Sequence, residues 1–155
     1  PQKSSASPRG QTTNVTTRSR LRQLEGGLRT KKELEQYSRF LSSFKDEEER
    51  IDFLEQPDFE SRARWLNQNN LVGRTRQVQD SMKDLVEAQD IAIGMPSQLV
   101  KKSWGEPEQV EVSGQPLLKN ERWRYSKYIS TPEGYKLEKK YVYFEGGKVV
   151  GWEVE

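Results

Sequence analysis

Acidic side chains and short motifs are where this chain could do chemistry, because it contains no cysteine and no histidine. Their absence excludes cysteine nucleophiles, thiolate metal sites, Ser-His triads and the usual zinc ligands. Carboxylates that could work as an acid–base pair lie at 47–49, at Glu106 with Glu108, and at Glu133. The first group suits a helix N-terminus and the others sit at predicted turns, so nothing around them predicts a raised pKa.

Two short motifs also lack the spacing that catalysis or phosphate binding requires. The segment 94–98, GMPSQ, is not the Gly-x-Ser-x-Gly of a nucleophile elbow, and 145–148, EGGK, does not have the spacing of a phosphate loop. We therefore predict that the protein is not an enzyme. We also predict no cofactor, no metal site and no small-molecule substrate.

Basic residues are concentrated at the start of the chain, which raises the question of nucleic acid. Residues 1–32 carry eight Lys or Arg and one acid, whereas 33–155 is net acidic and the whole chain has a net charge of +2. The segment 119–128, KNERWRYSKY, is basic and aromatic, as in base-stacking strands. Such a platform needs exposed aromatic rings, and alternation favours Trp123 and Tyr125 as core residues. Nucleic acid is therefore not the favoured partner.

Composition and caps divide the chain into three parts. Residues 1–29 read as a flexible basic leader, because 1–17 hold almost no large apolar side chain, although a short helix near 18–28 is compatible with its leucines. A helical segment follows over 30–75, where Thr30 with Glu33 forms a capping box and where Asp46 and Asp58 suit helix N-caps. Its apolar residues recur at helical spacing.

The third part, 76–155, is predicted to be a domain of two helices and a sheet. One helix runs over about 74–88, and a second begins near Pro96 and ends at Gly105. After Gly105 the spacing of apolar residues changes from the helical period of 3.6 toward the strand period of two. Four strands separated by turns near 113–116, 131–134 and 145–148 predict an antiparallel meander with one buried face. The fold class is therefore α+β, with a helical segment before two helices packed on a four-stranded antiparallel sheet.

The C-terminal half resembles the SmpA/OmlA, or BamE-like, family of outer-membrane lipoproteins. The resemblance rests on a Gly-Met step, a short helix containing a valine, a Gly-x-Pro exit, a Trp-x-Tyr strand and an apolar-x-Phe strand before a glycine turn. The fold is also similar to domains like the β-lactamase inhibitor protein. The residues that carry the pattern are Gly94, Met95, Val100, Trp104, Gly105, Pro107, Trp123, Tyr125, Val142, Phe144, Gly147 and Val149.

This resemblance implies a non-catalytic protein of the bacterial cell envelope, periplasmic or at the outer membrane, that acts through contact with other envelope proteins in assembly or maintenance. It also implies a precursor with an export signal upstream of Pro1, and membrane anchoring through a lipidated cysteine there. Two alternatives stay open. One is a cytoplasmic regulatory or nucleic-acid-associated protein that uses its basic arm, and the other is a secreted inhibitor-like binding module.

Five residues are candidates for protein contact. Arg122, Arg124 and Tyr128 alternate with the predicted core positions of their strand and so face outward. Arg62 and Trp65 form a second candidate edge, because Arg and Trp are frequent interface anchors.

Overall fold

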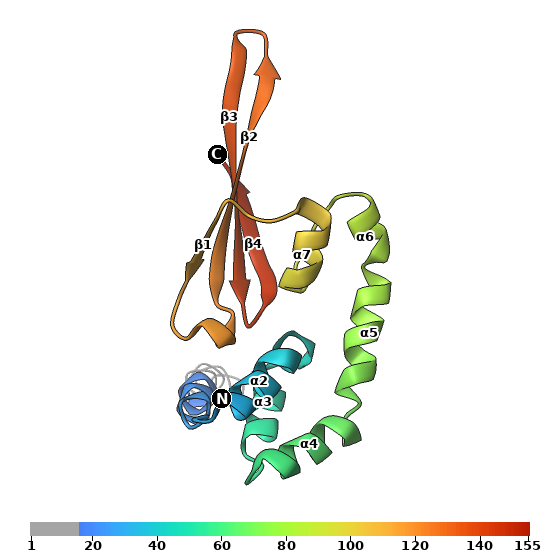
Figure 1. Cartoon of the computed structure of the whole chain (residues 1–155), viewed down its shortest axis with the longest axis vertical. Coiled ribbons are helices and arrows are strands. Elements are labelled where there is room, and N and C mark those ends of the chain that lie inside the picture. The colour runs from blue at the N-terminus through green and yellow to red at the C-terminus, as the bar shows by residue number, and fades with distance from the viewer. Residues whose placement is uncertain (1–15) are drawn as a thin grey trace, which may run out of the picture. The chain divides into compact units, whose positions relative to one another are not determined.

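The computed structural model describes residues 16–155, and the chain divides into two compact units, Pro1–Arg74 and Thr75–Glu155 (Figure 1). The described part of the first unit is built from helices, and the second unit combines helices with one antiparallel sheet. The predicted α+β class, in which a helical segment precedes helices packed on a four-stranded antiparallel sheet, is confirmed.

Short helices with polar caps make up the first unit. Residues 16–26 are helical, and then come α2, η1, α3 and α4, over Lys31–Phe40, Leu41–Ser43, Glu47–Leu54 and Phe59–Gln68. The side chains of Thr30, Asp46 and Asp58 each accept a hydrogen bond from an amide in the first turn of the following helix. Thr30 and Glu33 form the predicted reciprocal capping box. These local bonds fix where each helix begins.

An aromatic cluster forms the centre of the first unit. The ring centroids of Phe44 and Phe53 lie 5.3 Å apart, and the Trp65 ring lies 5.8 and 5.6 Å from them. Tyr37 stacks on Phe53 at 6.0 Å. The buried leucines of this unit are Leu21, Leu28, Leu41, Leu54, Leu66 and Leu71. Helices this short are marginal alone, so this burial is what stabilises them.

A buried polar network joins the helix at 16–26 to α2 and α3. The Tyr37 hydroxyl donates to the Glu25 carboxylate, and Arg50 donates to both, at 2.9 Å to the Tyr37 oxygen and 2.8 Å to Glu25 Oε2. The side chains of Glu25 and Arg50 are only 9% and 18% exposed. Burial raises the pKa of Tyr37, so its hydroxyl stays a donor at neutral pH.

The predicted flexible leader over 1–29 is wrong for its second half. Leu21 and Leu28 are buried, and Arg20 pairs with Glu55 at 3.0 Å. Residues 16–29 therefore belong to the first unit, because the leucine stripe of their helix is part of its core. Residues 1–15 of the predicted leader lie outside the described residues.

Helices α5, Leu71–Ser81, and α6, Lys83–Glu87, occupy the place of the single helix predicted over 74–88. The break at Met82 has a local cause. The Ser81 hydroxyl donates a hydrogen bond to the carbonyl of Val78. The same carbonyl also accepts a hydrogen bond from the Met82 amide. A serine that bonds back to the preceding turn bends a helix.

The sheet of the second unit is a meander of β1 (Gln109–Val112), β2 (Glu121–Thr131), β3 (Gly134–Glu145) and β4 (Lys148–Val154). All pairs are antiparallel, as predicted, and a 3-10 turn at Pro116–Leu118 lies between β1 and β2. Gly146 and Gly147 both have positive φ, at 57° and 78°, in the two-residue turn between β3 and β4. A tight hairpin requires this conformation, which glycine adopts without strain.

One face of this sheet is covered by helices. Trp123, Val142, Phe144 and Val149 are buried there with residues of α7 (Ser97–Trp104) and of the segment before it, namely Ile91, Met95, Leu99 and Val100. Met82, Leu85 and Val86, in and beside α6, pack against the same cluster. We call this the helix-side face and the opposite one the outer face.

Strands β2 and β3 continue beyond both neighbouring strands. The pairing of β1 with β2 ends at Arg124, and that of β3 with β4 ends at Lys140 in the ladder. Residues 127–131 and 134–138 therefore pair only with each other and project as a two-stranded arm, which Figure 1 shows above the rest of the sheet. We call residues 127–138 the arm.

Candidate functional site

The residues that carry the family resemblance build the fold of the second unit. Met95 and Val100 are fully buried, and Gly94 and Gly105, at the two ends of the α7 region, have φ of 86° and 83°. Pro96 is the N-cap of α7, one position before the predicted first turn. The remaining motif residues lie in α7, in the sheet or in the connections between them: Trp104, Pro107, Trp123, Tyr125, Val142, Phe144, Gly147 and Val149.

Arg122, Arg124 and Tyr128 lie on the outer face of β2, as their alternation with Trp123 predicts. The two arginines are held in ion pairs, Arg122 with Glu111 at 2.7 Å and Arg124 with Glu108 at 3.1 Å. Arg122 also lies over the Tyr141 ring at 5.1 Å. Tyr128, in contrast, is 74% exposed on the arm.

Two further exposed side chains join Tyr128 on the outer face of the arm. Leu137 is directly opposite Tyr128 in the ladder, and Tyr135 is opposite Ser130, two positions further along the same face. Tyr135 is 82% exposed, and Leu137 is 40% exposed. We call Tyr128, Tyr135 and Leu137 the outer strip. The alternation of side chains along 134–145 could have predicted that Tyr135 and Leu137 face outward. Val142 and Phe144 are core residues, so the odd-numbered residues of this strand lie on the opposite face.

The second predicted contact, Arg62 with Trp65, is wrong as an exposed edge. Trp65 is buried in the aromatic cluster, and its indole N–H donates to Asp52 at 3.2 Å. Arg62 pairs with Glu33 at 2.9 Å and also donates to the carbonyl of Leu54. Both side chains make their contacts within the first unit, because they lie on the face by which α4 packs against the other helices.

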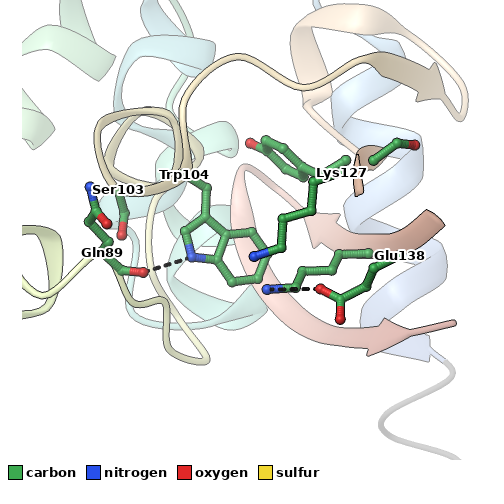
Figure 2. Close-up of a pocket in the computed structure, with 8 residues that line it drawn as sticks. Gln89, Ser103, Trp104, Lys127 and Glu138 are labelled. Atoms are coloured by element: carbon green, nitrogen blue, oxygen red, sulfur yellow. Dashed lines mark hydrogen bonds and ion pairs between the residues drawn. The ribbon is translucent and has the colours of Figure 1, made fainter. Parts of the chain in front are cut away.

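A pocket of about 340 Å³ lies between α7 and the base of the arm, on the helix-side face (Figure 2). Its aromatic wall is held in place. The Trp104 indole N–H donates to the Gln89 carbonyl at 3.0 Å, and the Tyr125 hydroxyl donates to the Gly105 carbonyl at 2.9 Å. The two rings meet edge to face, with centroids 5.6 Å apart. The wall is therefore preorganised before anything binds.

Charged side chains at the base of the arm complete this pocket. Lys127 is opposite Glu138 in the ladder, and the ammonium of Lys140 lies 3.8 Å from Glu138 and 4.8 Å from the centre of the Trp104 ring. The lining therefore holds two cations, Lys127 and Lys140, and one carboxylate, Glu138, which gives the pocket an excess positive charge. Burial raises the pKa of Tyr125, so its hydroxyl stays protonated. The pocket offers positive charge and an aromatic surface.

Two of the carboxylates that could serve as acid or base are engaged elsewhere. Glu49 is held by Arg74 in a two-bond pair at 2.6 and 3.1 Å, and although burial works to raise its pKa, these bonds and the Lys45 amide lower it. Hydrogen bonding to Ser126, with the charge of Arg124, lowers the pKa of Glu108. A lowered pKa is the opposite of what a general acid at neutral pH requires.

Residues 16–155 show neither a cluster of metal ligands nor a helix that could span a membrane. No three acidic side chains gather there in a way that could hold a metal ion. No helix in that range combines the length and the apolar composition needed to cross a membrane.

Comparison with known proteins adds nothing to this geometry. No family model, no characterised protein and no solved structure matches the chain.

Proposed function

We propose that this protein is a non-catalytic component of the bacterial cell envelope, at the periplasm or outer membrane, that acts by binding another envelope protein in assembly or maintenance. The envelope assignment rests on the SmpA/OmlA resemblance of the second unit. The mode of action rests on one observation, the outer strip.

The outer strip supports binding because its side chains are exposed and lie outside the buried core of the unit. Tyr128, Tyr135 and Leu137 lie outside the buried cluster of the second unit, on an arm beside which the described residues place no third strand. Contiguous exposed apolar side chains mark interaction sites, and tyrosine is enriched at interfaces because its ring is apolar and its hydroxyl is polar. Arg122 and Arg124 on the same face would form the polar rim of such a contact.

The test is site-specific crosslinking in native cells. A photoreactive residue replaces Tyr128 in the tagged full-length precursor, and a control carries it at Val72, an exposed apolar position of the first unit. We expect adducts with periplasmic or outer-membrane proteins from position 128, and loss of those adducts when Tyr135→Ser and Leu137→Ser are added. Cell fractionation checks the location.

Two results would overturn the proposal. Adducts of the same pattern from Val72 would mean that the outer strip has no special role. Recovery of the protein in the cytoplasm with nucleic acid, weakened steeply by salt and by replacing the exposed Arg22, Arg29 and Lys31 with glutamine, would favour the basic-arm alternative.

A further inference from the structure

Among residues 16–155, the free edge of β4 is paired along one half and unpaired along the other. Lys139 and Glu155 exchange two backbone hydrogen bonds, at 3.2 and 2.8 Å. Because bonded and non-bonded pairs alternate in an antiparallel ladder, Gly151 and Glu153 also face β3 with their backbone groups. The N–H and C=O groups of Trp152 and Val154 therefore point away from the sheet.

The chain itself covers the first half of this edge. The Gly94 amide donates to the Val149 carbonyl at 2.8 Å, and the Val149 amide donates to the Met95 carbonyl at 3.0 Å. Pro96 forms an antiparallel bridge with Lys148. This short segment acts as a partial fifth strand that stops where Val149 ends. An added strand can therefore form at this edge, because the protein already forms part of one.

Exposed apolar side chains flank the open half. Val150, Trp152 and Val154 are 48%, 42% and 55% exposed, and Ile93, next to the covering segment, is 62% exposed. Natural edge strands are usually protected by charge, proline or a covering element. Here three of the five residues from 150 to 154 are exposed apolar side chains, and no other segment within residues 16–155 pairs with this half of the edge.

We propose that residues 150–154 of β4 accept an extended segment of a partner protein as an added antiparallel strand. The inference rests on the proposed function, since it specifies how a partner is held. Main-chain bonds to Trp152 and Val154 would give affinity, and alternate side chains would give specificity.

Charge defines the chemistry of that segment. Trp152 and Val154 share the helix-side face with Val142 and Lys140, their ladder partners, whereas Glu153 lies on the outer face. Glu155 follows at the same parity as Glu153. The fitting segment therefore alternates apolar residues, on the face of Trp152, with lysine or arginine, on the face of Glu153.

A second copy of this chain fits less well than a partner segment. Two β4 strands could pair about a twofold axis in two registers that keep clear of the segment 94–97. One places Glu153 opposite Glu153, and the other places Glu153 opposite Glu155. Like charges directly opposite each other destabilise a strand pair, so both registers are disfavoured.

The test measures hydrogen exchange of single amides by NMR in the full chain. The probe is a capped synthetic peptide of alternating valine and lysine, and its control has glutamate in place of lysine. With free peptide at ten times the dissociation constant, only about one-tenth of the protein is free, so exchange of the Trp152 and Val154 amides should slow about tenfold. The amides of Gly151 and Glu153, already bonded to β3, are the internal reference.

Two proline variants locate the binding edge. Val154→Pro removes an outward N–H without touching the β3 ladder, and it should abolish the slowing at Trp152. Val112→Pro is the matched change on β1, where Ser113 bonds to Asn120 and the alternation turns the Val112 amide outward. That variant should bind the valine–lysine peptide like the parent protein.

Four results would overturn the inference. They are no slowing at millimolar peptide, equal slowing with the glutamate peptide, loss of binding in Val112→Pro alone, and slowing that depends on protein concentration without peptide, which would indicate a second copy. Crosslinking through Tyr128 that succeeds while these amides stay unprotected would reject only the edge and keep the proposed function.

Discussion

Replacing Arg50 by methionine should destabilise the first unit far more than the same change at Arg20. Both arginines pair with a glutamate of this unit at nearly the same distance, Arg50 with Glu25 at 2.8 Å and Arg20 with Glu55 at 3.0 Å. The pairs differ in burial. The side chains of the first pair are 18% and 9% exposed, and those of the second are 44% and 46% exposed. Comparing the two variants therefore isolates the effect of burial on an arginine–glutamate ion pair.

The expected magnitudes follow from what each change leaves behind. Arg50→Met leaves the Glu25 carboxylate buried with only the Tyr37 hydroxyl as a donor, and an uncompensated buried charge costs about 3–5 kcal/mol. Arg20→Met leaves Glu55 in water, and an exposed pair contributes about 0–1 kcal/mol. Methionine keeps most of the side-chain volume, so loss of packing is small in both variants.

Urea denaturation followed by far-ultraviolet circular dichroism measures the difference. With a slope of about 2 kcal/mol per molar urea, Arg50→Met should lower the midpoint of the first unit by about 2 M, and Arg20→Met by less than about 0.5 M. High salt should remove the Arg20 effect and leave the Arg50 effect, because buried charges are screened little. Equal shifts for the two variants would refute the reasoning.

Three other changes test the caps, the sheet core and one turn. The Thr30 hydroxyl lowers the pKa of Glu33 in the folded chain. The stability that this bond contributes is therefore present above the ordinary glutamate pKa and is lost as the pH falls below that value. Glu33→Gln should remove this loss and so flatten the fall of the melting temperature at acidic pH. Phe144→Ala, at a buried position, should cost about 3–5 kcal/mol in urea denaturation, whereas Val150→Ala, at a half-exposed one, should stay within about 0.5 kcal/mol. Gly105→Ala should cost about 1 kcal/mol or more by the same assay although nothing obstructs a Cβ there, because alanine is strained at its φ of 83°.

Local signals in the sequence predicted the caps and the turns of the fold correctly. The side-chain oxygen of Thr30, Asp46 or Asp58 accepts a hydrogen bond from the amide three residues later. Such a cap can therefore be recognised from four consecutive residues of the sequence. The same holds for Gly146 and Gly147, whose pair alone favours a tight hairpin. Strand alternation around Trp123 likewise placed the outer face of β2.

Features that depend on distant contacts could not be read in this way. Leu21 looked like part of a polar leader because its partners lie in other helices of the first unit. Trp65 looked like an interface anchor for the same reason. The arm was missed as well, because where β1 and β4 stop pairing depends on register and not on the composition of β2 or β3. For that reason Tyr135 and Leu137 were not recognised as candidate contact residues.

The arm can change in length only by certain steps. Its two strands pair with each other alone from Lys127 to Glu138, so an insertion or deletion there disturbs no third strand. Removing one residue from each strand would preserve the pairing but turn the distal part over, carrying Tyr135 to the opposite side. Removing two from each would shorten the arm by about 7 Å and keep its orientation. Related chains that conserve the outer strip should therefore differ in arm length by even numbers of residue pairs.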